Sequence, residues 1–155
     1  MVLGEAWLEG ALKGGAEATA ARAKALNGSG LIAWSQSLYG RAQVYQDENL
    51  AIRRALRDRS GTAVALNNLG IVAHDECDYL TARCLHTEAL AIWQELEYRR
   101  GVAFSLTNLG LAAFSQGDHL TARSLHAQSL ELMRSLEDVR GGDTLVVWRT
   151  SKAAR

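Results

Sequence analysis

Histidine and cysteine are the residue types of this chain best suited to chemistry, and their spacing limits what they can do. His86 and His126 lie 40 residues apart, and each ends the same run, Leu-Thr-Ala-Arg-x-Leu-His. Imidazole can act as a base or bind a metal ion. A histidine that recurs together with its surroundings, however, indicates a structural position that copies of one unit share. The recurrence therefore favours packing side chains over catalytic ones.

The other candidates for metal binding or nucleophilic chemistry are poorly spaced. Cys84 precedes His86 by two residues, which places them on different sides of a helix, and Cys77 lies seven residues before Cys84. His74 and Asp75 are adjacent near an expected helix end and form a weak metal-binding pair. The sequence contains no glycine-rich phosphate loop, nucleophile motif or recognisable pair of carboxylates. We therefore predict no enzymatic activity, no metal site and no cofactor.

Composition argues against several classes of protein. The 17 Lys and Arg residues balance 17 Asp and Glu residues, so the chain lacks the basic excess that nucleic-acid binding requires. No apolar run approaches the roughly 20 residues that span a bilayer, and the first residues carry no secretory signal pattern. Two cysteines in 155 residues are typical of reduced thiols in the cytosol. We expect a cytoplasmic protein with neither a nucleic-acid nor a membrane partner.

The elements that hold these residues follow from an internal repeat. Residues 61–100 and 101–140 agree at 18 of 40 positions, and the agreements include Leu-x-Asn-Leu-Gly and Asp-x-Leu-Thr-Ala-Arg. A fixed period of this size marks stacked supersecondary units. Within each unit the apolar residues follow helical spacing in two stripes, which the polar segments 76–78 and 116–118 separate. Each unit is therefore predicted to be a pair of helices in an all-α protein.

The pattern extends backwards, more weakly, into residues 18–58, and an amphipathic stripe precedes it. The chain has no proline, so its helices must end at glycine and polar turns. The predicted helices are 2–13, 18–36, 40–58, 62–75, 79–97, 102–115 and 119–137. The domain prediction is a repeat array over residues 1–140, in which the half-hairpin 2–13 precedes repeats at about 18–58, 62–97 and 102–137. Residues 141–155 form either a capping helix or a frayed tail.

These residues resemble tetratricopeptide repeats. The family's helix hairpin has a large apolar residue, then Leu-Gly, and a small residue in the second helix where two helices cross closely. The matching residues are Leu66, Leu69, Gly70, Ala82 and Ala89 in one unit, Leu106, Leu109, Gly110, Ala122 and Ser129 in the next, and Leu26, Gly30 and Ala42 in the first, where Ser29 replaces the leucine. The resemblance covers about 2–140 and implies a right-handed α-solenoid of antiparallel helix hairpins.

Two features depart from the family's standard repeat of about 34 residues. The period is 40 residues, which we attribute to a longer second helix, and the proline near the end of that helix is missing. Both departures resemble the repeats of kinesin light chain and the C-terminal arrays of bacterial signalling ATPases and transcription activators. In the family, the position of His86 and His126 holds a large packing residue, and Gln46 occupies it in the first unit. We call this the slot position.

By resemblance, the first helix of each unit lines the concave face of the superhelix. The predicted groove residues are Lys24, Asn27, Leu31 and Trp34, then Val64, Asn67, Asn68, Ile71 and His74, then Phe104, Thr107, Asn108, Leu111 and Phe114. An asparagine amide both donates and accepts, so it can hold a peptide backbone of any sequence. Aromatic side chains supply the usual hot spots. Lys24 is the one basic residue of this set, which argues against recognition of a chain terminus.

We therefore expect a non-catalytic protein–protein interaction scaffold that binds a peptide or helical segment in the groove, as part or relative of a bacterial signalling or transcription regulator. Three alternatives stay open. The asparagines could serve only to tie one helix pair to the next. The groove around Trp34, His74 and Phe114 could bind a small effector. The array could also form a homo-oligomer through its terminal segments, 2–13 and the apolar patch 145–148.

Overall fold

The computed structural model describes residues 16–140, and the elements within that range are helices. They are α2 (Ala16–Ser35), α3 (Tyr39–Ala55), α4 (Arg59–Asp75), α5 (Tyr79–Glu95), α6 (Arg99–Ser115) and α7 (His119–Arg140). Each bound lies within three residues of the predicted one. The predicted helix at 2–13 and the predicted cap or tail at 141–155 lie outside the described residues.

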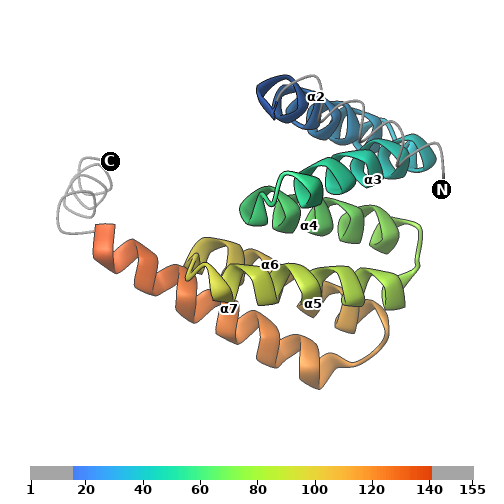
Figure 1. The fold of residues 1–155 in the computed structure, drawn as a ribbon. Helices are drawn as coiled ribbons and strands as arrows, with labels where there is room; N and C mark the ends of the chain where they lie inside the picture. Colours follow the sequence, from blue (N-terminus) through green and yellow to red (C-terminus); the bar gives the residue numbers. More distant parts are fainter. Residues whose placement is uncertain (1–15, 141–155) are drawn as a thin grey trace, which may run out of the picture.

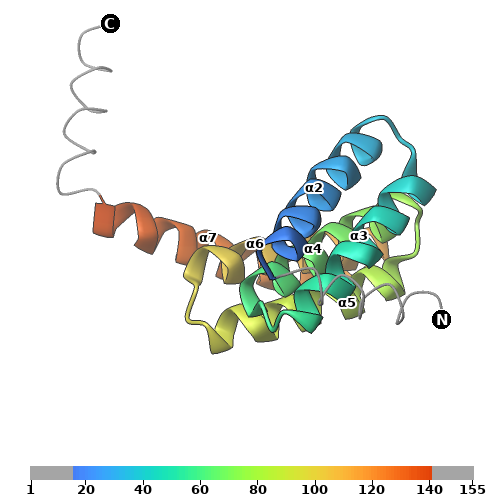
Figure 2. The ribbon, with the colours of Figure 1, turned by 45° about the horizontal axis from the view of Figure 1, so that its top comes forward.

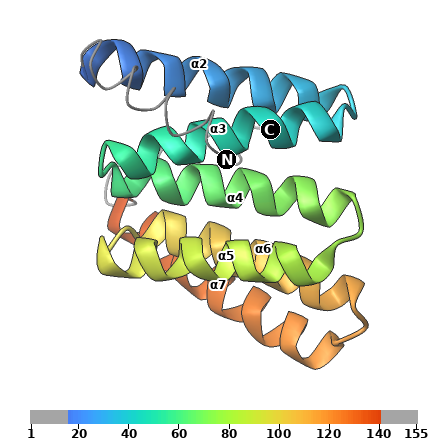
Figure 3. The ribbon, with the colours of Figure 1, turned by 45° about the vertical axis from the view of Figure 1, so that its right-hand side comes forward.

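The helices stack in chain order, and each packs antiparallel against the next (Figure 1). In Figure 3 α2 lies at the top and α7 at the bottom, and α5 and α6 overlap between α4 and α7. The more extensive contacts between helices that are not sequence neighbours join α2 to α4 and α4 to α6. These three helices therefore approach one another on the inner, concave side of the stack. The described part of the chain is the predicted α-solenoid of helix hairpins.

Each helix is joined to the next by a three-residue turn whose middle residue has a positive φ. In the turn after α4, the N–H of Cys77 donates to the carbonyl of His74 at 2.9 Å, and that of Asp78 to the carbonyl of Ala73 at 2.8 Å. This is the Schellman motif, which requires a left-handed residue after the helix. The Asp78 carboxylate then caps α5 by accepting from the N–H of Thr81. One turn thus ends a helix and begins the next without proline.

The helices α3, α4, α5 and α6 are all 17 residues long. The prediction that the extra residues of the repeat lie in a longer second helix is therefore wrong, because both helices of a unit have the same length. The reason is geometric. Antiparallel neighbours that are joined by equally short turns cover each other's apolar faces fully only when their lengths match. The terminal helix α7 is longer, at 22 residues, and its C-terminal part extends past the other helices (Figure 2).

The core lies between successive helices, and small residues occupy the points where these helices cross. Its largest cluster joins α3, α4 and α5 and includes Leu50, Leu66, Ile92 and Trp93. One close contact recurs in each unit, between Gly30 and Gln46, Gly70 and His86, and Gly110 and His126. A Cβ added at Gly70 would lie 2.5 Å from the imidazole of His86. The mid-helix glycine, which costs about 1 kcal/mol relative to alanine, is therefore required by the residue in the slot position.

Candidate binding groove

Large apolar side chains remain exposed along the inner helices α2, α4 and α6. Those at predicted groove positions are Leu31, Trp34, Val64, Phe104, Leu111 and Phe114, with exposed fractions between 37% and 59%; Ile32 of α2, 61% exposed, lies outside the predicted set. We call these six residues the apolar stripe, and the sequence analysis assigned all of them to the groove. Ile71 and His74 lie among them and are half-buried, whereas Lys24 is exposed on α2. Exposed apolar side chains that gather on one face are typical of an interaction surface.

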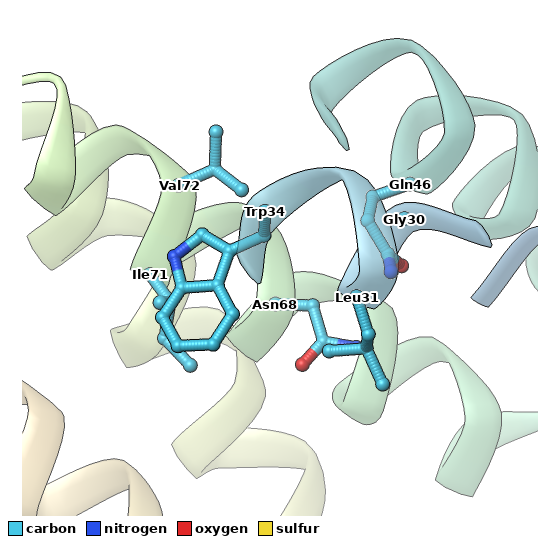
Figure 4. Close-up of a pocket in the computed structure, with 7 residues that line it drawn as sticks. All are labelled: Gly30, Leu31, Trp34, Gln46, Asn68, Ile71 and Val72. Atoms are coloured by element: carbon cyan, nitrogen blue, oxygen red, sulfur yellow. The ribbon is translucent and has the colours of Figure 1, made fainter. Parts of the chain in front are cut away.

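At the joint between α2 and α4 the groove is nearly filled by the protein's own side chains. Figure 4 shows Leu31 and Trp34 of α2 beside Asn68 and Ile71 of α4 around a cavity of about 40 Å³. The indole N–H of Trp34 donates to the carboxylate of Asp75 at 2.7 Å, which fixes the ring. This volume is far below the roughly 300–1,000 Å³ that is typical of small-molecule pockets.

The asparagines of this joint bond to one another. The amide of Asn68 donates to Asn27 Oδ1 at 2.8 Å, and the amides of Gln46 and Asn49 donate to the same oxygen at 3.3 and 3.5 Å. Gln46 also donates to the backbone carbonyl of Asn27 at 3.2 Å. These bonds join α2, α3 and α4. In the unbound protein, Asn27 and Asn68 therefore tie one helix pair to the next, as one of the alternatives in the sequence analysis states.

Asn67 lies beneath the groove surface, since only 3% of the residue is exposed. Its Oδ1 accepts from Nδ1 of His86 at 2.9 Å, and its Nδ2 donates to Ser105 Oγ at 3.1 Å. His86 is fully buried, and this burial, with a smaller effect from His74, lowers its pKa to about 4. At neutral pH His86 is thus an uncharged packing residue that bonds to an amide, as the recurrence in the sequence indicates.

The joint between α4 and α6 is less complete. The hydroxyl of Thr107 bonds to the carbonyl of Ala103 and to Ser129 within its own unit. Asn108 is 91% buried, and its amide nitrogen has no hydrogen-bond partner among the described residues. Asn67 and Asn108 therefore form the base of the groove rather than its exposed surface. Their participation in binding stays a prediction.

A serine, a histidine and an aspartate meet near the C-terminal ends of α4 and α6. Ser115 Oγ lies 3.0 Å from His74 Nε2, and His74 Nδ1 lies 3.4 Å from Asp75 Oδ1. A serine bonded to a histidine that is bonded to an aspartate suits nucleophilic catalysis only if nearby N–H donors can stabilise an oxyanion. Ser115 ends a helix, where the free backbone groups are carbonyls, and the N–H groups of residues 116–118 already donate to α6 carbonyls. The arrangement therefore suits a link between inner helices better than an active site.

A second, larger cavity of about 370 Å³ lies between α4 and α6. It is lined by Ser60, Val64, Asn67, Asn68, Trp93, Tyr98, Arg100, Gly101 and Phe104. Val64 and Phe104 belong to the apolar stripe, so the cavity is continuous with the groove. Trp93, Tyr98 and Arg100 are absent from the predicted set, because they come from the outer helix α5, from a turn and from the first residues of α6. The one sequence signal for them is the Arg-Arg-Gly run at 99–101.

Within the side chains that the structure describes, no three of His, Cys, Asp and Glu lie close enough to hold a metal ion. The pair His74 and Asp75 bonds instead to Ser115 and Trp34. Cys77 and Cys84 are exposed free thiols. None of the helices α2 to α7 combines the length and the apolar character needed to cross a membrane.

Two solved structures share this architecture. The crystal structure of BtubC (BKLC) from P. vanneervenii is similar with a TM-score of 0.69 and 24% sequence identity, over 74% of this chain and 48% of that one. The TPR domain of Arabidopsis FLU is similar with a TM-score of 0.71 and 15% identity, over 76% of this chain and 98% of that domain. At these identities the likeness concerns the fold. The present chain spans about half the length of BtubC.

Comparison at the level of sequence identifies the repeats themselves. No curated protein matches the chain. A family model described as the tetratricopeptide repeat matches residues 21–95 and again residues 61–135. The two matches overlap and together extend from 21 to 135, which is well over half of the 155 residues. The protein therefore belongs to the tetratricopeptide repeat family.

Proposed function

We propose that the protein is a non-catalytic scaffold that holds an extended or helical segment of a protein partner in its inner groove. Tetratricopeptide repeats typically bind protein partners and rarely carry out chemistry, and this chain has such repeats over 21–135. The observation that carries the proposal is the apolar stripe, whose six large side chains stay 37–59% exposed. Covering them with a partner would gain about 25 cal/mol for each Å² of apolar surface removed from water.

The position of the apolar stripe makes it a better candidate binding surface than the other exposed apolar residues. Val44, Leu80 and Leu120 are 63–83% exposed, but they lie on α3, α5 and α7, which approach one another less closely than the inner helices do. One bound segment can therefore touch α2, α4 and α6 together. The stripe also contains Trp34, Phe104 and Phe114, and aromatic residues are the side chains that most often dominate binding energy.

The finer parts of the proposal concern the cellular setting. We propose that the array belongs to, or is related to, a bacterial signalling or transcription regulator. The resemblance of the Leu-Asn-Asn-Leu-Gly and Leu-Thr-Ala-Arg runs to such arrays supports this. A cytosolic setting is supported by the two exposed free thiols, Cys77 and Cys84, which suit a reducing compartment.

Selection from a displayed library of random dodecapeptides tests the proposal. The groove variant is Phe104→Glu with Leu111→Glu, and the matched control is Leu80→Glu with Leu120→Glu, which adds the same charge at residues that are more exposed. We expect peptides selected on the wild type to lose at least about tenfold in affinity for the groove variant and to bind the control variant normally. Equal binding by both variants, with helical circular dichroism intact, would remove the groove from the account.

Replacement of the asparagines gives a second arm. Asn108→Ala removes an amide nitrogen that has no partner among residues 16–140, so a loss of peptide affinity would report binding. Asn68→Ala also breaks the bond to Asn27 and must be judged together with the stability of the variant.

A further inference from the structure

The last described helix, α7, exposes an apolar face whose equivalents in α3 and α5 are covered. In α3, Leu50 is 8% exposed because it packs in a cluster with residues of α4. In α5, Trp93 is 5% exposed and its ring lies against Gly101 of α6. The equivalent residues of α7 are Leu130 and Met133, which are 51% and 44% exposed. Among the described helices, only α6 packs extensively on α7, and none lies beyond it (Figure 1).

The exposed face is one stripe of α7. His126, Leu130, Met133 and Glu137 follow one another at steps of four, three and four residues, so they lie on the same side of the helix. The residue at the slot position shows the same trend, because it is 1% exposed in the first two units and half-buried in the third, where it is His126. Two large apolar side chains between polar ends form a surface that another helix can cover.

The chain does not turn back onto this face in the way that it does in the preceding unit. Helix α5 ends at Glu95, and residues 96–98 form the turn to α6. Helix α7 stays helical through the equivalent residues, 136–138, and ends at Arg140. The short turn that brings α6 onto α5 is therefore absent after α7.

The sequence after α7 also departs from the pattern of an inner helix. Three buried residues in the middle of α6 are Leu109, Gly110 and Ala112. The residues 40 positions later are Arg149, Thr150 and Lys152. Charged side chains at positions that pack against a neighbouring helix would be costly to bury. These two observations favour an occupant from outside the chain.

The charges beside the stripe favour a second copy of α7 as that occupant. Arg123 and Glu137 are both exposed, and they lie seven residues before and seven residues after Leu130. Neither forms an ion pair within the described part of the chain. In an antiparallel pair of helices centred on Leu130, Arg123 of each copy lies beside Glu137 of the other. A two-fold axis forms this pair twice and places the apolar residues together in the middle.

We propose that two copies of the array associate through α7, in an antiparallel two-fold contact centred on Leu130. Leu130 and Met133 of each copy cover those of the other, which removes apolar surface from water. The pairs of Arg123 with Glu137 fix the register at the rim. This surface differs from 2–13 and 145–148, where the sequence analysis placed self-association. The predicted groove residues lie on α2, α4 and α6, so the contact does not use them.

Sedimentation velocity of the full chain between about 1 and 500 μM tests the proposal, because one helix face is smaller than the roughly 800 Å² per partner of a stable interface. The variant Leu130→Glu places a carboxylate at the centre of the contact. The matched control is Leu120→Glu, the same change on the same helix at a residue that is 83% exposed and off the stripe. We expect the wild type and the control to dimerise alike, and Leu130→Glu to dimerise at least about tenfold more weakly.

Two results would overturn the proposal. One is a dimer that Leu130→Glu does not weaken. The other is a wild type that stays monomeric over the whole range. If, in that case, thermal unfolding shows Leu130→Glu to be far less stable than Leu120→Glu, a segment of the same chain covers the face of α7.

Charge reversal tests the antiparallel arrangement at exposed residues. Arg123→Glu alone, or Glu137→Arg alone, brings like charges together at both ends of the contact. We expect each to weaken dimerisation by at least about threefold at low salt. The double variant restores both pairs with their charges exchanged, so it should dimerise within about twofold of the wild type. A double variant that dimerises no better than the single ones would contradict the two-fold antiparallel contact.

Discussion

The two joints between the inner helices are built from equivalent parts of the repeat, but the amide that recurs in both finds an acceptor among the described residues only in the first. Between α2 and α4, the amide of Asn68 donates to Asn27 and the remaining cavity is about 40 Å³. Between α4 and α6, the donors of Trp93 and Asn108 have no partner among the described residues, and the cavity is about 370 Å³.

The residue at the slot position also differs between the joints, although it bonds to the equivalent asparagine in both. In the first unit Oδ1 of Asn27 accepts from the amide of Asn68 and also from the amide of Gln46. In the second unit His86 bonds to Oδ1 of Asn67, the equivalent of Asn27, and that oxygen also lies 3.3 Å from the hydroxyl of Ser105. The amide of Asn108, the equivalent of Asn68, is then left without an acceptor.

The largest expected difference between the two joints is their response to acid. The slot position holds the ionisable residue His86 in the second unit and the non-ionisable Gln46 in the first. The pKa of His86 is lowered to about 4 in the folded protein, chiefly by burial and secondarily by His74, against about 6.5 when unfolded. Between these values the unfolded chain binds more protons, so the stabilisation is complete above pH 6.5 and is lost as pH falls towards 4. We expect a loss of about 3 kcal/mol in the free energy of unfolding, measured by urea titration at several pH values.

The control for the acid effect is His86→Gln, which gives the second unit the residue of the first. We expect its free energy of unfolding to change much less between pH 7 and pH 4. If wild type and variant lost the same stability over that range, His86 would not be the group that titrates.

Replacing Asn27, which supplies the acceptor at the first joint, should lower the free energy of unfolding more than replacing Asn108. The amide nitrogen of Asn108 has no partner among the described residues. Asn27→Ala leaves the buried side of the Asn68 amide without its acceptor and removes one of two acceptors each from Gln46 and Asn49, which we expect to cost about 2 kcal/mol. Asn108→Ala removes an amide nitrogen that bonds to nothing described, so its cost should stay below about 1 kcal/mol. Chemical denaturation of both variants measures the difference, and the reverse order would contradict the comparison of the joints.

The glycines offer a matched pair that tests the close contact at the slot. We expect Gly70→Ala to destabilise by about 1–2 kcal/mol, because the new Cβ would lie 2.5 Å from His86 and strain the packing. Gly28→Ala lies in helix α2 with nothing within 4 Å of its Cβ, so it should stabilise by about 0.5–1 kcal/mol through helix propensity. Thermal unfolding reports both signs, and a stabilising Gly70→Ala would show that the contact imposes no constraint.

The turns should give the smallest effects. Cys77 and Gly117 hold equivalent middle positions with φ of 63° and 81°, a conformation that costs non-glycine residues about 1 kcal/mol or more. We expect Cys77→Gly to stabilise and Gly117→Ala to destabilise, each by about 1 kcal/mol. Melting temperatures that shift the same way for both variants would show that the turn conformation is not the cause.

The fold could be predicted because it depends on periodic features. Apolar spacing, polar turns and a 40-residue repeat are visible in the sequence, and they placed all helix bounds of the described region within three residues. Helix length was misassigned, because the sequence does not show how a period divides between two helices. The apolar stripe was found for the same reason as the helices, since its members recur at fixed positions on the first helix of each unit.

The polar part of the candidate site could not be predicted in the same way. Asn67, which was predicted to face the groove, bonds instead to His86 and to Ser105 of a neighbouring helix, and the sequence does not show these partners. Trp93 and Arg100 come together across α5 and α6, and no periodic pattern relates them. The argument against recognition of a chain terminus considered only the predicted groove residues and so did not include Arg100.

The most direct test of the account is to locate a selected peptide by intermolecular nuclear Overhauser effects in its complex with the wild-type protein. The account predicts contacts from the peptide to the side chains of Phe104, Leu111 and Phe114 on the inner helix α6. It also predicts no contacts to Val44, Leu80 or Leu120 on the outer helices, although these are at least as exposed. Contacts to the outer residues without contacts to the inner ones would contradict the claim that the groove is the binding surface.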